Sequence, residues 1–155
     1  MKILFVCTGN TCRSPLAEAI ARKIAIERGL SDLDVSSAGT SAWEGAPASD
    51  GSLLVGMEHG LDLSMHRAQL LSRTLVSGID VALGMGPHHV ERLEALGGTN
   101  VHSLVSYASH GTEDRAISDP VGQDLSVYRA TYDELDREIR RALDRLTADR
   151  PSDAQ

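Results

Sequence analysis

Two reactive side chains, the thiol of Cys7 and the guanidinium of Arg13, lie six positions apart within residues 6–15. Residues 3–6 form an apolar run typical of a parallel strand buried on both faces, and Pro15 is favoured at the start of a helix. The unpaired N–H groups and the positive dipole end of a helix N-terminus attract anions. The stretch between this strand and this helix is therefore predicted to cradle a phosphate group.

Cys7 is the candidate nucleophile of this cradle. The N–H groups of the loop, together with Arg13, favour the thiolate form of Cys7, which is a nucleophile at neutral pH. Arg13 carries a planar fork of donors that fits two oxygens of a phosphoryl group, which a lysine could not match. The alternative is that Cys7 is a small buried hydrophobic residue, as free cysteines commonly are. The predicted substrate-binding residues of the cradle are Thr8, Gly9, Asn10, Thr11, Cys12 and Ser14.

The elements that must position this loop follow from the hydrophobic pattern of the rest of the chain. Strand-like and helix-like segments alternate, which predicts a single doubly wound α/β domain with helices on both faces of a parallel sheet. Such sheets bind ligands at the carboxyl ends of their strands, where the loop of Cys7 lies. We predict strands at residues 3–6, 34–37, 79–85 and 100–104, helices at 15–28, 48–59, 87–96 and 124–147, a loop at 105–123, a domain spanning 1–148 and a disordered tail at 149–155.

The composition argues against several classes of protein. A net charge of −7 without a basic run disfavours nucleic acid or an anionic membrane as partner. No apolar run approaches the ~20 residues that span a bilayer, so we expect a cytoplasmic protein. The two cysteines, five residues apart, form neither a disulfide framework nor a zinc site, and the adjacent His88 and His89 do not share a helix face. We therefore expect no metal and no cofactor, and a solvated helix start at the two histidines.

The sequence also resembles a known family. Residues 6–18 read Val-Cys-Thr-Gly-Asn-Thr-Cys-Arg-Ser-Pro-Leu-Ala-Glu and residues 118–120 read Ser-Asp-Pro. This combination is similar to the low-molecular-weight protein-tyrosine phosphatases, and the similarity covers nearly the whole chain. The resemblance implies a four-stranded parallel sheet in flavodoxin-like order. It also implies that Cys7 is the nucleophile, Arg13 the phosphate clamp and Asp119 the general acid that protonates the leaving group.

Three further residues acquire roles from the resemblance. It implies that Ser37 hydrogen-bonds Asn10, that Trp43 forms an aromatic wall beside the pocket, and that His66 supports the fold without catalysing. The residues alone leave plainer alternatives open, because Ser37 could be an ordinary strand-end hydroxyl and Trp43 a packing residue. Asp119 could likewise be a surface turn residue, although Pro120 restricts its backbone to an extended form that helps to aim the carboxyl group.

The substrate class depends on Thr11. Family members that act on phosphotyrosine carry a bulky aliphatic residue at this position and usually an aromatic pair just after Asp-Pro, whereas this chain has Thr11, Val121 and Gly122. It thereby resembles the bacterial protein-arginine phosphatases most, whose loop reads Cys-Thr-Gly-Asn-Thr-Cys-Arg-Ser. A hydroxyl at Thr11 can hydrogen-bond a guanidinium or position the hydrolytic water. We expect phosphorylated proteins as partners, with phosphoarginine as substrate, phosphotyrosine as the alternative, and a monomer as the favoured oligomeric state.

The residues disfavour two other functions. An arsenate reductase can use the same cradle, but its thiol cascade needs a further cysteine, and none follows Cys12. A phosphocysteine carrier of the sugar-phosphotransferase type has no use for Arg13 or Asp119. The proximity of Cys12 to a reactive thiolate also predicts a reversible Cys7–Cys12 disulfide after oxidation, the alternative being that Cys12 fills space beneath the cradle.

Overall fold

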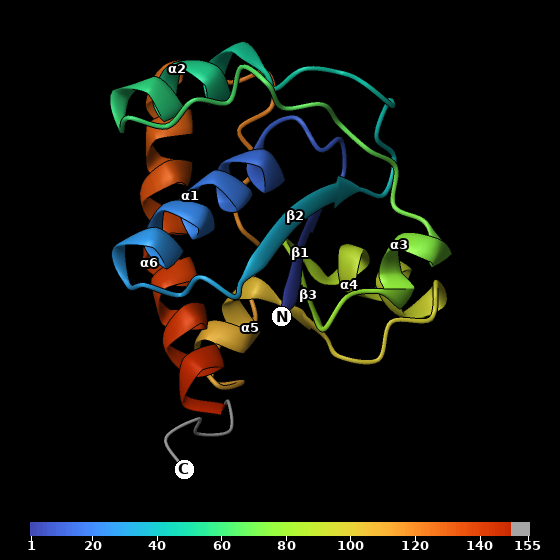
Figure 1. Cartoon of the computed structure of the whole chain (residues 1–155). Coiled ribbons are helices and arrows are strands. Elements are labelled where there is room, and N and C mark those ends of the chain that lie inside the picture. The colour runs from blue at the N-terminus through green and yellow to red at the C-terminus, as the bar shows by residue number, and fades with distance from the viewer. Residues whose placement is uncertain (150–155) are drawn as a thin grey trace.

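A computed structural model describes residues 1–149. Its centre is a four-stranded sheet in the order β2-β1-β3-β4, in which every neighbouring pair of strands is parallel. Figure 1 shows this sheet between two groups of helices. The predicted α/β class and flavodoxin-like order are thus confirmed. The strands are β1 (Lys2–Cys7), β2 (Asp34–Gly39), β3 (Val81–Gly84) and β4 (Val101–Ser103).

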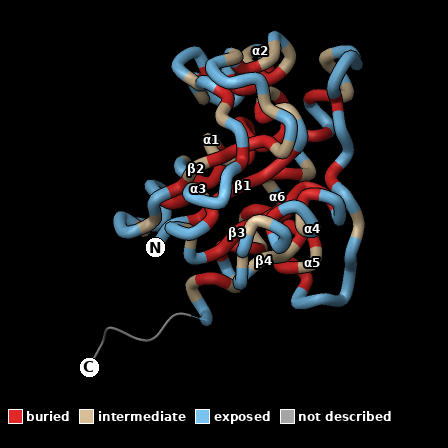
Figure 2. The backbone as a smooth tube through the Cα atoms, turned by 90° about the vertical axis from the view of Figure 1, so that its right-hand side faces the viewer, coloured by how far each residue is buried: buried red, intermediate tan, exposed pale blue. Residues whose placement is uncertain are grey.

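The side chains of β1 alternate between two cores. Ile3 and Phe5 belong to the larger core, whereas Leu4 and Val6 belong to the smaller one on the opposite face. Because successive side chains of a strand point to opposite faces, an unbroken apolar run is buried on both sides. Figure 2 shows the resulting burial through the middle of the molecule. Four helices border the larger core, namely α1 (Arg13–Glu27), α2 (Asp50–Glu58), α5 (Leu104–Ala108) and α6 (Leu125–Asp149), and α3 (Arg73–Ser77) and α4 (Pro87–Ala95) border the smaller one.

Two short helices were not predicted. The predicted loop at 105–123 is wrong at its start, because α5 occupies Leu104–Ala108. The hydroxyl of Ser103 caps α5 by accepting from Ser106 N at 3.3 Å, and Ser72 caps α3 in the same way. Helices of five residues are too short to show a helical hydrophobic period, so only their caps and tertiary packing distinguish them from loops.

The bounds of helices α1 and α6 also differ slightly from the prediction. Helix α1 begins at Arg13, so Pro15 is its third residue, where the missing N–H still costs no intrahelical hydrogen bond. Helix α6 continues to Asp149, which makes the first residue of the predicted tail helical. The rest of that predicted tail, residues 150–155, lies outside the described residues.

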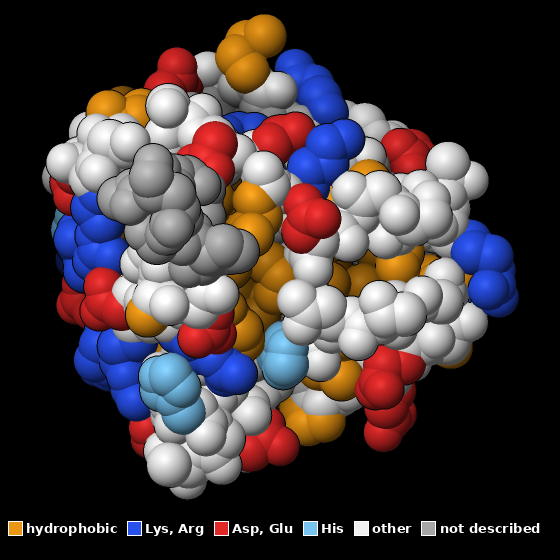
Figure 3. Space-filling view, turned by 60° about the horizontal axis from the view of Figure 1, so that its bottom comes forward, with side chains coloured by type: hydrophobic (Ala, Val, Ile, Leu, Met, Phe, Trp, Pro, Cys, Tyr) orange, Lys and Arg blue, Asp and Glu red, His pale blue; other side chains and the backbone are white. Residues whose placement is uncertain are grey.

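No helix within residues 1–149 has both the length and the apolar character needed to cross a membrane. Figure 3 views the end of the molecule that carries the amino ends of the strands. On this face the Lys and Arg side chains are interspersed with Asp and Glu side chains, with apolar side chains between them. The loop of Cys7 lies at the other end of the sheet, where the strands finish.

Candidate active site

The loop between β1 and α1 is held by backbone hydrogen bonds from its neighbours. Thr40 N donates to Cys7 O at 3.0 Å, Ser41 N to Thr8 O at 2.9 Å, and Ser49 N to Thr11 O at 2.9 Å. At Gly39 a Cβ atom would lie 2.4 Å from Thr8 O, so only glycine allows β2 to approach the loop this closely. The segment that follows β2 therefore fixes the shape of the cradle.

Cys7 ends β1 and is buried beneath this loop. Its Sγ lies 2.9 Å from Ser14 Oγ and accepts from Asn10 N at 3.3 Å. Both contacts can stabilise negative charge on the sulfur, and the N-terminus of α1 adds its positive dipole end. A cavity of about 200 Å³ opens over the sulfur. It is lined by Cys7, Thr8, Gly9, Thr11, Cys12, Arg13, Asp119 and Val121.

Asn10 keeps the loop in its curved form. Its φ of 56° lies in the left-handed region, which asparagine tolerates better than most residues do. The side-chain amide donates to Ser14 Oγ at 2.7 Å and to Ser37 Oγ at 3.0 Å. Gln69 N donates to Asn10 Oδ1 at 3.0 Å, and His66 Nε2 lies 2.7 Å from the Asn10 carbonyl oxygen. The expected bond between Ser37 and Asn10 is confirmed, and His66 supports the loop from outside.

Arg13 and Asp119 meet at the cavity although they are far apart in the chain. The buried Arg13 donates from Nη1 to Ile117 O at 3.0 Å, while its Nη2 lies 3.6 Å from Asp119 Oδ2. The Asp119 side chain is 45% exposed and accepts from Val121 N at 3.1 Å. The guanidinium is thereby held at the cavity wall, and a carboxylate stands at the cavity opening.

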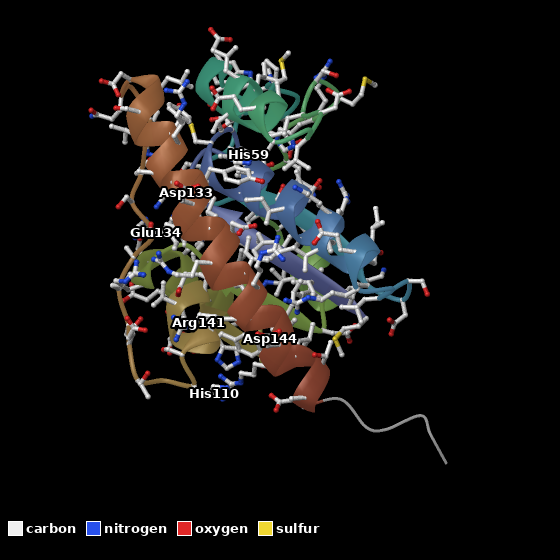
Figure 4. The ribbon with its side chains drawn as sticks, turned by 90° about the vertical axis from the view of Figure 1, so that its left-hand side faces the viewer. His59, His110, Asp133, Glu134, Arg141 and Asp144 are labelled. Atoms are coloured by element: carbon white, nitrogen blue, oxygen red, sulfur yellow. The ribbon has the colours of Figure 1, made fainter. Side chains whose placement is uncertain are left out.

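The segment before Asp119 is anchored at two points. Ile117 N donates to Met85 O at 2.8 Å, which ties the segment to the end of β3. Glu134 of α6, labelled in Figure 4, accepts from Ser118 N at 3.1 Å and pairs with Arg115 at 2.6 Å. Glu134 was not predicted from the sequence, because nothing local to α6 indicates that its carboxylate reaches this loop.

Cys12 lies on the side of the loop that faces α2 and α6. Its Sγ is 3.4 Å from Ser49 Oγ, the N-cap of α2, and 3.4 Å from Tyr128 Oη on α6. Burial, together with the hydrogen bond to Cys12, raises the pKa of the Tyr128 hydroxyl above its ordinary value. These contacts, which were not predicted from the sequence either, connect the cradle to two helices.

Trp43 lies at the surface with 84% of its area exposed, in the loop after β2. It is not among the residues that line the cavity over Cys7. Val121 does line that cavity and is 60% exposed. The predicted role of Trp43 as an aromatic wall stays a prediction, and the structure adds Val121 as an apolar residue at the cavity opening.

The prediction of a solvated histidine pair is wrong for one of the two. His88 is exposed, but His89 is fully buried, and its Nε2 lies 3.0 Å from Thr8 Oγ1 in the cradle. Burial, and then the electrostatic effects of His88 and Arg13, lower the pKa of His89 to about 4. One signal could have located it, because a residue just after β3 lies beside the loop after β1 when the two strands are neighbours. Among residues 1–149 no group of three or more His, Cys, Asp or Glu side chains could hold a metal ion.

Comparison with known proteins agrees with this geometry. The family model described as low molecular weight phosphotyrosine protein phosphatase matches residues 2–152. The protein-arginine-phosphatase of Bacillus subtilis (strain 168) is 35% identical over 155 residues, which cover 97% of this chain and 99% of that protein. The low molecular weight protein-tyrosine-phosphatase PtpB of Staphylococcus haemolyticus (strain JCSC1435) is 39% identical over 137 residues, covering 87% of this chain and 92% of that protein.

A solved structure is similar over the whole domain. The YwlE arginine phosphatase, as a C7S mutant with a phosphorylated active-site serine, superimposes with a TM-score of 0.89 at 33% identity, covering 97% of this chain and 98% of that chain. The chain belongs to the low molecular weight phosphotyrosine protein phosphatase family. It is a low-molecular-weight protein phosphatase, a hydrolase directed at either phosphoarginine or phosphotyrosine, and its relatives divide between these two activities at similar identity.

Proposed function

We propose that this phosphatase hydrolyses phosphoarginine on proteins through a phosphocysteine intermediate. The observation that carries the substrate class is Thr11, whose hydroxyl-bearing side chain lines the cavity over Cys7. The cavity chemistry comes from Cys7, Arg13 and Asp119, which the fold brings together. No metal enters this mechanism, because the loop N–H groups and Arg13 supply the positive charge that a phosphoryl group requires.

In the first step the Cys7 thiolate attacks phosphorus in line with the leaving group. Arg13 and the backbone N–H groups of residues 8–14 hold the equatorial oxygens, and the Asp119 carboxyl protonates the departing nitrogen or oxygen. The half-exposed position of Asp119 at the cavity opening suits this role, because the leaving group must depart toward solvent. The products are phosphocysteine and the free side chain of the substrate protein.

In the second step water hydrolyses the phosphocysteine. Asp119, now a carboxylate, takes a proton from the water, which attacks phosphorus and releases inorganic phosphate and the Cys7 thiolate. The phosphorylated active-site serine of the YwlE C7S mutant supports an intermediate on the equivalent side chain, since a serine there holds the phosphoryl group in that protein. The contact between Ser14 and Cys7 Sγ suits the thiolate as leaving group.

Two candidate substrates differ in what they present to Thr11. A guanidinium next to phosphorus offers N–H donors, which the Thr11 hydroxyl can accept, whereas a phenyl ring offers only an apolar face. Similarity to the arginine phosphatases of Bacillus subtilis and of Geobacillus stearothermophilus, the second 39% identical over 150 residues, supports the first substrate. Similarity to the tyrosine phosphatase PtpB supports phosphotyrosine as the second candidate.

Thr11→Ile is expected to reduce the preference for phosphoarginine over phosphotyrosine. The change removes the hydroxyl that a guanidinium needs and adds apolar bulk on which a phenyl ring packs. The value of kcat/KM for phosphoarginine should therefore fall about tenfold more than the value for phosphotyrosine. Steady-state kcat/KM on matched phosphoarginine and phosphotyrosine peptides measures this change. Thr11→Ser is the matched control, because it keeps the hydroxyl and should keep the preference.

Two results would contradict this assignment. Parallel changes on both peptides in Thr11→Ile would mean that Thr11 only shapes the loop. A wild-type protein that prefers the phosphotyrosine peptide would promote the second candidate. Release of inorganic phosphate by the wild type separates either phosphatase from a phosphocysteine carrier, which would retain the phosphoryl group after mixing with a donor.

We also propose that Cys12 protects Cys7 from irreversible oxidation. Hydrogen peroxide oxidises the Cys7 thiolate to a sulfenic acid, and attack by the Cys12 thiolate on that sulfur forms a disulfide and releases hydroxide, which becomes water. The Sγ of Cys12 contacts Ser49 and Tyr128, so its side chain must turn away from them to reach Cys7.

Peroxide treatment is therefore expected to yield a Cys7–Cys12 crosslink that thiol reverses. Mass spectrometry of digested protein detects the crosslink, and activity after thiol addition measures the recovery. Cys12→Ser should form no crosslink and should recover only partly, because its sulfenic acid proceeds to the sulfinic acid. If the wild type shows no crosslink and Cys12→Ser recovers equally well, Cys12 has no protective role.

A further inference from the structure

His89 is a buried titratable group that the mechanism above does not use. It is the third residue of α4, directly after the turn that follows β3, and none of its surface is exposed. Its Nε2 lies 3.0 Å from Thr8 Oγ1, whereas its Nδ1 has no hydrogen-bond partner among residues 1–149. The buried imidazole therefore contacts the phosphate cradle through Nε2, while Nδ1 makes no hydrogen bond within the described residues.

The unpartnered nitrogen favours one tautomer. A neutral imidazole has one N–H donor and one acceptor nitrogen. With the proton on Nδ1, a buried donor would have no acceptor, which is rare in folded proteins because of its cost. With the proton on Nε2, the donor has Thr8 Oγ1 as its acceptor, and only a lone pair on Nδ1 remains unpaired.

The charges around the ring agree with a neutral imidazole. His88 packs against it at 3.9 Å between ring centroids, and Arg13 and Asp119 lie on the cavity side. Burial has the largest effect on the pKa of His89, His88 and Arg13 lower it further, and Asp119 opposes them, so that its pKa is about 4. The His89 ring is therefore neutral near pH 7.

The tautomer of His89 determines whether the Thr8 hydroxyl can donate a hydrogen bond to a bound anion. When His89 donates to Thr8 Oγ1, a lone pair of that oxygen is occupied, and the Thr8 hydroxyl proton must point elsewhere. Thr8 is exposed and lines the cavity over Cys7, so its hydroxyl proton is free to be donated to an anion in the cradle. In the opposite tautomer, with the proton on Nδ1, the Thr8 hydroxyl would donate its proton to His89 Nε2.

We propose that His89 is a positioning residue, which donates from Nε2 to Thr8 Oγ1 and so directs the Thr8 hydroxyl as a donor to the phosphoryl group. The proposal rests on the proposed function of the cradle, in which Cys7 carries the phosphoryl group. It adds a side-chain donor to the backbone N–H groups and Arg13. The donor is oriented before substrate arrives, which is how hydrogen bonds contribute most to transition-state stabilisation.

The tautomer can be observed directly. Two-bond nitrogen–proton correlation spectra of wild-type protein labelled with ¹⁵N distinguish the two neutral forms and the cation. Between pH 5 and pH 8 we expect the His89 ring to remain in the neutral Nε2–H form, since its pKa of about 4 lies below this range. A neutral Nδ1–H form, or a cation at pH 6, would overturn the proposal without any variant having to fold.

A double-mutant cycle tests the connection to Thr8. His89→Leu and Thr8→Val should each lower kcat about tenfold, as expected for one lost hydrogen bond to a developing charge. The double variant should also fall only about tenfold, because both changes remove the same contact, whereas independent effects would multiply to about a hundredfold. His89→Gln, whose amide can donate from nearly the same place, should restore kcat to within about threefold of wild type.

Controls separate this role from simple packing. Glu91→Gln changes an exposed residue of the same helix that does not contact His89 in any interaction described above, and it should leave kcat unchanged. Thermal unfolding midpoints show whether a variant is folded at the assay temperature, and a loss of kcat in His89→Leu that Gln does not rescue would overturn the proposal. Multiplicative effects in the cycle would do so as well. The proposed function fails by a different result, namely hydrolysis by Cys7→Ser, which leaves the tautomer of His89 unaffected.

Discussion

Cys7→Ser is expected to abolish turnover while the protein still binds phosphate or vanadate. A serine hydroxyl stays protonated near neutral pH and is a far weaker nucleophile than a thiolate. Within residues 1–149 the groups that hydrogen-bond Cys7 Sγ are Ser14 Oγ and Asn10 N, and neither is a general base that could activate a serine at this position. The donors that hold the anion, the N–H groups of residues 8–14 and Arg13, remain in place. Phosphopeptide hydrolysis measures the first effect, and isothermal titration with vanadate or phosphate measures the second.

Arg13→Ala is the companion variant that should lose both properties. The guanidinium is buried at the cavity wall and donates to Ile117 O. Within residues 1–149 no other Lys or Arg lines that cavity, so nothing replaces its charge. Arg28→Ala is the matched control, because Arg28 is the C-cap of the same helix, at the surface, where it pairs with Asp144. Substantial hydrolysis by Cys7→Ser would refute a covalent mechanism, and full anion binding by Arg13→Ala would remove Arg13 from the cradle.

Asp119→Ala is expected to lower turnover by on the order of a hundredfold or more when the leaving group is poor. A general acid matters most when the departing atom needs a proton, so the loss should shrink with an activated ester such as para-nitrophenyl phosphate. Comparing kcat on the phosphopeptide and on the activated ester measures this difference. An equal loss on the two substrates would show that Asp119 acts in some way other than by protonating the leaving group.

Asp119→Asn separates proton transfer from positioning. The amide oxygen can still accept from Val121 N, as the carboxylate does at 3.1 Å, but the amide cannot supply a proton. Turnover of the substrate with the poor leaving group should therefore fall as far in Asp119→Asn as in Asp119→Ala. Recovery of activity in Asp119→Asn would mean that the side chain serves only to hold the loop, and an unchanged rate in both variants would remove Asp119 from the site.

The core of the site could be predicted from sequence because it is local. Cys7, Arg13 and the glycine and asparagine between them lie in one loop, and a buried strand before a helix start determines how that loop presents its N–H groups. The alternation of strands and helices likewise limits the sheet to few topologies, since parallel strands need right-handed crossovers. These inferences depend on patterns that recur within a few residues of each other.

Other parts of the site depend on contacts between distant segments. Asp119 reaches the cavity because Glu134 on α6 and the end of β3 hold the segment before it. Neither hydrogen bond can be predicted from the residues near position 119. The sequence predicted Asp119 only through resemblance to a family. In the same way, Cys12 and Tyr128 stand 116 positions apart and meet because α6 packs beside α1.

The class of fold, the end of the sheet at which the site lies and the predicted chemistry of the loop could therefore be inferred from the amino-acid sequence. These follow from residue types and spacings whose physical effects are short-ranged. The burial of His89 against Thr8 and the exposed position of Trp43, outside the lining of the cavity, depend on how distant segments pack together and could not be inferred in this way. Burial is a property of which surfaces pack together, so a histidine at a helix start and a tryptophan in a loop look alike in sequence whether they are exposed or enclosed.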